Sequence, residues 1–274
     1  EGFDRSNQPF FGLNLILVGG CVTLAMRTGP KLQRTAWASC AAAFLVSALI
    51  SFGRGFWAAM LAACITAIAI EGKRRRSISA VAVVAAAGIV ACIMLGALAG
   101  ASGIDLRGFG EAVLDRGVLG ATSVKYLEGT LGDRYDNINR ALIQEHAVLG
   151  IGFYLGLGTA ADIDLADTGH NLYADLMLRM GAVGLLFFSF LFWLFIRRCR
   201  LALSLDLPPV HRAAVVGCLG AGLGNLVWAI SSSHIMYRRG MLEMALIMAV
   251  VEILIHHAAE RGQKTRESVV GEAA

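Results

Sequence analysis

The chain has 274 residues, of which 57% are hydrophobic and only 16% charged, and its mean hydropathy is +0.65. Soluble domains carry about 25% charged residues, so this composition excludes an ordinary soluble enzyme and, being rich in apolar residues, an intrinsically disordered chain. The net charge of +4 does not indicate nucleic-acid binding, and the six cysteines show neither a disulfide framework nor a metal-binding spacing.

Seven apolar segments predict an all-α, polytopic transmembrane helix bundle. In chain order they cover residues 10–26, 35–52, 55–70, 79–103, 171–196, 213–231 and 240–255. They divide the chain into N-terminal spans (1–103), a long loop (104–169), C-terminal spans (170–257) and a polar tail (258–274) that we expect to be disordered. The chain starts at Glu1 without a signal-peptide pattern, so we expect further spans upstream.

The connecting segments predict the orientation of these spans. More than half of the Lys and Arg residues lie in one alternating set of segments, around residues 27–34, 73–76, 197–212 and 261–266. The 104–169 loop instead has more acidic than basic residues. Because positive charge is retained in the cytoplasm, we expect the long loop outside the cytoplasm and the tail inside.

Arg54 interrupts an apolar stretch that would otherwise run from residue 35 to 70. An arginine at bilayer depth costs roughly 2.5–3.5 kcal/mol, and intramembrane charges usually mark functional sites. The alternative is a turn between two spans, with the side chain snorkelling to the interface. We favour function, because a turn needs no arginine on the side where positive charge is disfavoured.

The long loop contains an amphipathic pattern over residues 134–146, which predicts a helix at the membrane interface. Its arginines, Arg134 and Arg140, suit phosphate oxygens through bidentate hydrogen bonds. A solvated helix face, or pairing with the neighbouring acidic residues Asp133, Asp136 and Glu145, is an equally good interpretation. An acidic cluster at Asp162, Asp164 and Asp167 is read as a solvated charge run rather than a metal site.

His170, Asn171 and Tyr173 open the fifth span. An imidazole at the water–lipid boundary can accept a proton near neutral pH, although a lone interfacial histidine more often caps the start of a helix. Asp175 and Arg179 lie four residues apart, a spacing typical of a structural ion pair within a helix.

Two further features lie in the C-terminal spans. Arg238 and Arg239 violate the charge rule in a short outside loop, which favours a functional role. Gly220 and Gly224 form a small-residue pattern that fits close helix packing, and we expect that packing inside this bundle rather than at a dimer face.

In series, three segments resemble the O-antigen ligase / O-antigen polymerase superfamily of bacterial membrane glycosyltransferases. Ser51-Phe-Gly-Arg54-Gly-Phe-Trp57 resembles a Ser-x-x-Arg-Gly segment at the head of a span, and residues 134–152 resemble an arginine-bearing helix running into a His-Pro-Leu-Leu-Gly-Val-Gly turn. Residues 170–186 are similar to a His-Asn-x-Tyr motif followed by Glu-Leu-Gly-x-x-Gly-Leu. Ala147 stands in place of the proline and Arg179 in place of an acidic residue, and the spacing leaves open whether Arg134 or Arg140 matches the loop arginine.

The resemblance implies transfer of a glycan from an undecaprenyl-diphosphate-linked donor to a glycan or lipid acceptor. The reaction would take place on the periplasmic face of the bacterial inner membrane, without a metal ion or other cofactor. It implies catalytic roles for His170, Arg54 and Arg134. We add substrate-binding roles at the same membrane face for Arg140, Asn171, Tyr173, Arg238 and Arg239.

Two other functions stay open. One is a transporter or flippase for a lipid-linked or anionic substrate, with Arg54 and the Asp175–Arg179 pair along its pathway. We rank it second because we see no inverted repeat and no proline inside a span. The other is a non-catalytic subunit that assembles with polysaccharide-synthesis proteins. We expect membrane lipids, and no nucleic acid, among the partners.

Overall fold

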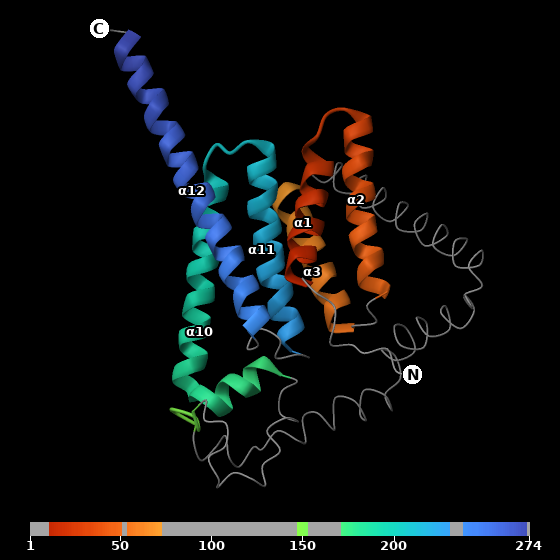
Figure 1. Cartoon of the computed structure of the whole chain (residues 1–274), viewed down its shortest axis with the longest axis vertical. Coiled ribbons are helices and arrows are strands. Elements are labelled where there is room, and N and C mark those ends of the chain that lie inside the picture. Colours follow the sequence, from red (N-terminus) through yellow and green to blue (C-terminus); the bar gives the residue numbers. More distant parts are fainter. Residues whose placement is uncertain (1–10, 51–53, 73–146, 153–170, 231–237, 273–274) are drawn as a thin grey trace, which may run out of the picture.

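The structure is a computed structural model that describes residues 11–50, 54–72, 147–152, 171–230 and 238–272. Every regular element in these ranges is an α-helix (Figure 1). This confirms the all-α prediction for the described part of the chain, whereas the expected span over 79–103 and the amphipathic helix over 134–146 lie outside it. The helices are α1 (Phe11–Arg27), α2 (Lys31–Ile50), α3 (Arg54–Glu71), α10 (Leu172–Ser204), α11 (Pro209–Ala229) and α12 (Arg238–Glu272).

Three helical segments are long and apolar enough to cross a membrane: Leu172–Ser204, Pro209–Ala229 and Gly240–Arg261. A span needs about 20 predominantly apolar residues to cross the hydrocarbon core. Large apolar side chains also point outward from the bundle, among them Leu186, Phe187, Phe190 and Trp193 of α10. These features are those of a membrane protein. Two shorter apolar segments, Gly12–Arg27 and Gly55–Glu71, lie in the N-terminal part of the bundle.

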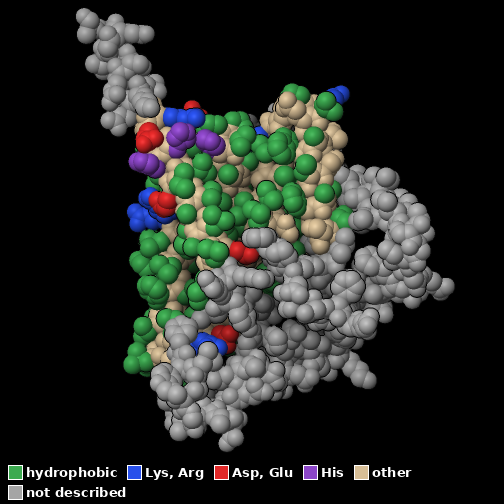
Figure 2. Space-filling view, viewed as in Figure 1, with side chains coloured by type: hydrophobic (Ala, Val, Ile, Leu, Met, Phe, Trp, Pro, Cys, Tyr) green, Lys and Arg blue, Asp and Glu red, His purple; other side chains and the backbone are tan. Residues whose placement is uncertain are grey.

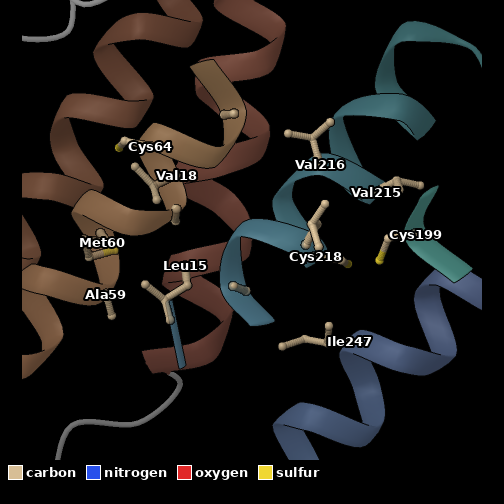
Figure 3. Packing of buried hydrophobic residues seen from close by; sticks show 14 of the residues in the cluster. Leu15, Val18, Ala59, Met60, Cys64, Cys199, Val215, Val216, Cys218 and Ile247 are labelled. Carbon is tan, nitrogen blue, oxygen red and sulfur yellow. The ribbon is translucent and has the colours of Figure 1, made fainter. Parts of the chain in front are cut away.

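Helix α11 is the centre of the packing. It contacts α1 and α3 most extensively, and it also contacts α12 and α10, while α2 packs mainly against α1. Figure 3 shows Leu15 and Val18 of α1 and Met60 of α3 on one side of α11, with Cys199 of α10 and Ile247 of α12 on the other. The core is therefore one continuous cluster that joins helices from both halves of the sequence.

Glycines allow α11 to approach its neighbours closely. A Cβ atom on Gly217 would overlap the backbone of α1 at Ile16, and one on Gly224 would lie 2.7 Å from the carbonyl oxygen of Ala59 in α3. Gly220 faces Ala63 one turn away on the same side of α3. The predicted close packing of Gly220 and Gly224 is thus confirmed, and their partner is α3 of the same chain.

One end of the bundle, which we call the Glu71 end, is held by a buried carboxylate between two arginines. Glu71 is the last residue of α3, and its side chain is only 4% exposed. Its carboxylate accepts hydrogen bonds from Nε of Arg27 at the end of α1 (2.5 Å) and from Nε of Arg212 near the start of α11 (2.6 Å). Arg212 also donates from Nη1 to the carbonyl oxygen of Leu203 (2.7 Å), so four helices meet here.

Helix α12 corrects the prediction for the tail. Residues 258–272 were expected to be disordered, but the helix continues to Glu272 (Figure 1). The segment contains Ala, Glu, Arg, Gln and Lys, which are strong helix formers. The pair between His256 Nε2 and Glu260 Oε1 (3.3 Å) adds an i,i+4 contact at the point where the apolar sequence stops.

Candidate functional site

The end of the bundle opposite the Glu71 end brings together helix termini from across the sequence. We call it the Trp228 end. The ring of Trp228, near the end of α11, lies 5.5 Å from the ring of Phe56 at the start of α3. Two residues earlier, the carbonyl oxygen of Leu226 accepts a hydrogen bond from the hydroxyl of Tyr173 at the start of α10 (3.1 Å). The starts of α3 and α10 therefore meet at the end of α11.

The starts of α1 and α12 also lie at the Trp228 end. The backbone N–H of Gly12 in α1 donates to Oε2 of Glu243 in α12 (3.0 Å). Next to Glu243, the sulfur of Met244 accepts a hydrogen bond from Nδ2 of Asn225 in α11 (3.5 Å). Asn225 precedes Leu226 directly, so these contacts extend the Trp228 end across the bundle.

Three of the predicted arginines lie at the starts of two helices at this end. Arg54 begins α3, two residues before Phe56, and Arg238 and Arg239 begin α12, one turn before Glu243. Their backbones thus share one end of the bundle, although their side chains lie outside what the structure describes. The position of Arg54 also fits the alternative of a turn between spans, because α2 ends at Ile50.

Asn171 has a clear structural role as the N-cap of α10. Its Oδ1 accepts hydrogen bonds from the backbone N–H groups of Tyr173 (2.9 Å) and Ala174 (3.1 Å). These are groups at a helix start that have no partner within the helix. A substrate contact by Asn171 would therefore use its amide NH₂ group. Likewise, Tyr173 already donates its hydroxyl hydrogen to Leu226, so it would meet a substrate as an acceptor.

Helix α10 is broken at Gly181, which has φ 62° and ψ −162°. The segment before the break lies across the lower end of the bundle, and the segment after it runs along the bundle axis (Figure 1). The span predicted over 171–196 lies within the candidate span Leu172–Ser204, but its helix is interrupted at Gly181. The start of α10, next to His170, lies in a short helix at the Trp228 end rather than at the head of a straight span.

The turn 147–152 packs against the break and forms backbone hydrogen bonds with α10 on both sides of it. The N–H groups of Ile151 and Gly152 donate to the carbonyl oxygens of Leu178 and Arg179, both at 2.8 Å. In the other direction, the N–H groups that follow Gly181 donate to carbonyl oxygens of the turn: Ala182 to Ala147 (2.7 Å) and Val183 to Val148 (3.2 Å). The turn thus replaces the helical hydrogen bonds that the break removes.

Glycines make this docking possible. Gly150 has φ 68° and Gly181 has φ 62°, a region that other residues enter only at a cost. A Cβ atom on Gly150 would overlap the backbone of Arg179, and one on Gly181 would overlap the backbone of Val148. The turn 147–152 of the long loop is therefore held against α10 by backbone hydrogen bonds, and two of the three segments that carry the family resemblance are in contact.

The other predicted site residues have varied outcomes. Asp175 is buried and Arg179 half-buried in the first segment of α10, and the salt bridges between described residues include none that joins them. The carbonyl oxygen of Arg179 instead anchors the docked turn. The remaining candidates lie outside the described residues: His170, Arg134, Arg140, and the acidic cluster at Asp162, Asp164 and Asp167.

Sequence reasoning missed two acidic residues that the structure places at helix ends. Glu243 is the single acidic residue within the apolar run 240–251, and Glu71 is the last residue of an apolar helix just before a basic segment. An isolated carboxylate in an apolar run is costly without a partner. The sequence alone therefore indicated that both residues have a partner in the fold. Within the described residues, no group of three or more His, Cys, Asp or Glu side chains could hold a metal ion.

Comparisons of the chain with known protein families, curated proteins and solved structures gave no match.

Proposed function

We propose that this chain is a membrane glycosyltransferase of the O-antigen ligase/polymerase type. It would transfer a glycan from an undecaprenyl-diphosphate carrier to a hydroxyl group of a glycan or lipid acceptor, on the periplasmic face of the bacterial inner membrane. One observation supports this most. The helix starts at Arg54, Asn171 and Arg238 lie together at the Trp228 end, opposite the end whose basic residues are predicted to be cytoplasmic.

The chemistry follows from the charge of the leaving group. The anomeric carbon of the donor sugar forms a bond to the acceptor oxygen while its bond to the diphosphate oxygen breaks. The electron pair of the broken bond leaves with the lipid diphosphate. Guanidinium groups of Arg54 and of Arg134 or Arg140 stabilise that developing charge. His170 takes the proton from the acceptor hydroxyl. Arg238 and Arg239 hold the diphosphate or its lipid neighbours, and no step requires a metal ion.

The docked turn supports the same proposal. The turn 147–152, which is part of the 104–169 loop, is fixed to α10 at Gly181. In the proposed mechanism, this contact keeps the described part of the loop at the Trp228 end, and Arg134 or Arg140 of the same loop acts on the diphosphate. A loop that covers the site also excludes water, which would otherwise hydrolyse the donor.

The break in α10 also favours the alternative function. Transporters often form their binding sites from interrupted helices, and the sequence-based argument against a transporter assumed that no span is broken. That argument no longer holds at Gly181. A transporter or flippase for a lipid-linked or anionic substrate is thus the second candidate.

Reconstitution of the purified full-length protein in liposomes tests the two functions together. With an undecaprenyl-diphosphate-linked glycan, an acceptor glycan and a chelator, we expect glycan on the acceptor and free carrier diphosphate. Movement of the labelled donor between leaflets without transfer would instead identify a transporter. If neither activity is seen until another envelope protein is added, the chain is an assembly subunit and the proposal is wrong.

A further inference from the structure

A cavity of about 630 Å³ lies at the Glu71 end, far from the proposed transfer site in the fold. Its walls come from the α10–α11 turn (residues 205–209), from His211 of α11, and from His257, Ala258 and Arg261 of α12. The turn contributes apolar surface through Leu205, Leu207 and two prolines, and α12 contributes polar groups. The cavity therefore has an apolar side and a polar side.

The cavity lies at the ends of three helical segments that are candidate spans: Leu172–Ser204, Pro209–Ala229 and Gly240–Arg261. The apolar residues of α10 and α12 stop earlier, before Arg197 and after Ile255. The cavity therefore lies on the polar side of that boundary, which in a bilayer is the side of the lipid headgroups. Figure 2 shows histidine, Lys/Arg and Asp/Glu side chains gathered here, above a surface of apolar side chains.

The polar groups are suited to a phosphate that carries hydroxyl groups nearby. The rings of His211 and His257 lie 5.7 Å apart, and each neutral imidazole can donate one N–H. Arg261 adds a guanidinium fork, which matches phosphate oxygens. Asp206 is the acidic residue that lines the cavity, and its carboxylate can accept hydrogen bonds from hydroxyl groups.

We propose that this cavity binds an anionic glycerophospholipid of the membrane, with the phosphate held by Arg261, His211 and His257 and the headgroup hydroxyls held by Asp206. The acyl chains extend along the apolar surface of the spans. Basic pockets between spans on the cytoplasmic side suit such headgroups. This inference does not depend on the proposed glycosyl transfer.

Native mass spectrometry of the full-length protein in detergent tests the proposal. We expect the protein to retain phosphatidylglycerol in preference to phosphatidylcholine and phosphatidylethanolamine. Arg261→Gln should weaken phosphatidylglycerol binding about tenfold, because it removes one charge-assisted contact. The matched control is Arg198→Gln, which removes an arginine that pairs with Glu252 outside the cavity and should leave binding unchanged.

A double variant, His211→Ala with His257→Ala, should also weaken phosphatidylglycerol binding, because it removes both imidazole donors from the cavity. Equal retention of all three lipids would overturn the proposal, as would equal effects of Arg261→Gln and Arg198→Gln. Displacement of the lipid by an equal concentration of free glycerol phosphate would identify a soluble phosphate compound as the ligand and reject the membrane source.

Discussion

At the scale of the residue, Gly181 and Gly150 determine whether the turn 147–152 can pack against α10. Each has a positive φ, and each has the other's element packed where a Cβ atom would lie. The paired amide and carbonyl groups of the turn 147–152 then satisfy the broken helix. The resemblance in sequence drew attention to these glycines as motif residues, and their physical role is to let two backbones touch.

Gly181→Ala should lower the free energy of unfolding by about 2 kcal/mol or more. A side chain at φ 62° and ψ −162°, a region that is essentially restricted to glycine, costs roughly 1–3 kcal/mol, and overlap with the backbone of Val148 adds to that cost. Thermal unfolding in detergent measures the effect. Gly29→Ala is the matched control, because a Cβ atom there meets nothing within 4 Å. Equal stability of the two variants would show that the turn does not dock on α10.

Sequence reasoning found some of these residues and could not find their partners. It placed Arg54 and Asn171 at the beginnings of helices, because a polar residue beside an apolar run is visible in the chain. It could not show that Glu71 contacts Arg212, or that Glu243 contacts Gly12, since each pair is far apart in sequence. Such contacts depend on which helices are neighbours, and hydropathy does not contain that information.

At the scale of the element, α11 is the helix on which the others assemble. Its glycines face α1 and α3, and its other side faces α10 and α12. Without a hydrophobic driving force inside a bilayer, close approach of backbones is a main source of helix association. The bundle therefore depends on small side chains along α11 more than on large ones.

Gly217→Ala should destabilise the bundle by roughly 1–3 kcal/mol, because the new methyl group overlaps the backbone of Ile16 and separates α11 from α1. Gly20→Ala is the contrasting variant. Its Cβ atom would lie 3.5 Å from the nearest atom, an ordinary contact, and alanine favours helix over glycine by up to about 1 kcal/mol. Thermal unfolding should rank Gly20→Ala at or above wild type. The reverse ranking would contradict the observed packing.

The positions of the described helices were largely predictable, whereas their ends and breaks were not. Long apolar runs gave α1, α3 and α11 to within a few residues. The predicted C-terminal ends of the fifth and seventh spans, at 196 and 255, precede the observed ends of α10 and α12 at Ser204 and Glu272. Arginines mark where a helix leaves the membrane and not where it stops being helical. The break at Gly181 was missed because a single glycine inside a helical pattern is usually tolerated.

At the scale of the whole molecule, the two ends of the bundle have different chemistry. The Glu71 end holds a buried ion-pair network and a cavity at the predicted headgroup level. The Trp228 end gathers the helix starts of the proposed transfer site, together with the docked turn. The proposed function requires these ends to face opposite sides of the membrane.

Cysteine labelling tests this orientation. We expect Gly29→Cys, between α1 and α2 at the Glu71 end, to react with a membrane-impermeant maleimide only after the cells are opened. Ile230→Cys, just after α11 at the Trp228 end, should react in intact cells. The positive-inside rule gives this direction, and labelling of Gly29→Cys in intact cells would reverse the topology and exclude a periplasmic site.

The most direct test of the proposed function is the rate of glycan transfer by His170→Ala in the liposome assay. We predict that transfer is abolished while the protein still inserts and unfolds like the wild type, because no other group takes the proton from the acceptor hydroxyl. His256→Ala, which changes an exposed histidine of α12 at the Glu71 end, should transfer at the wild-type rate. Wild-type transfer by His170→Ala would contradict the proposed mechanism.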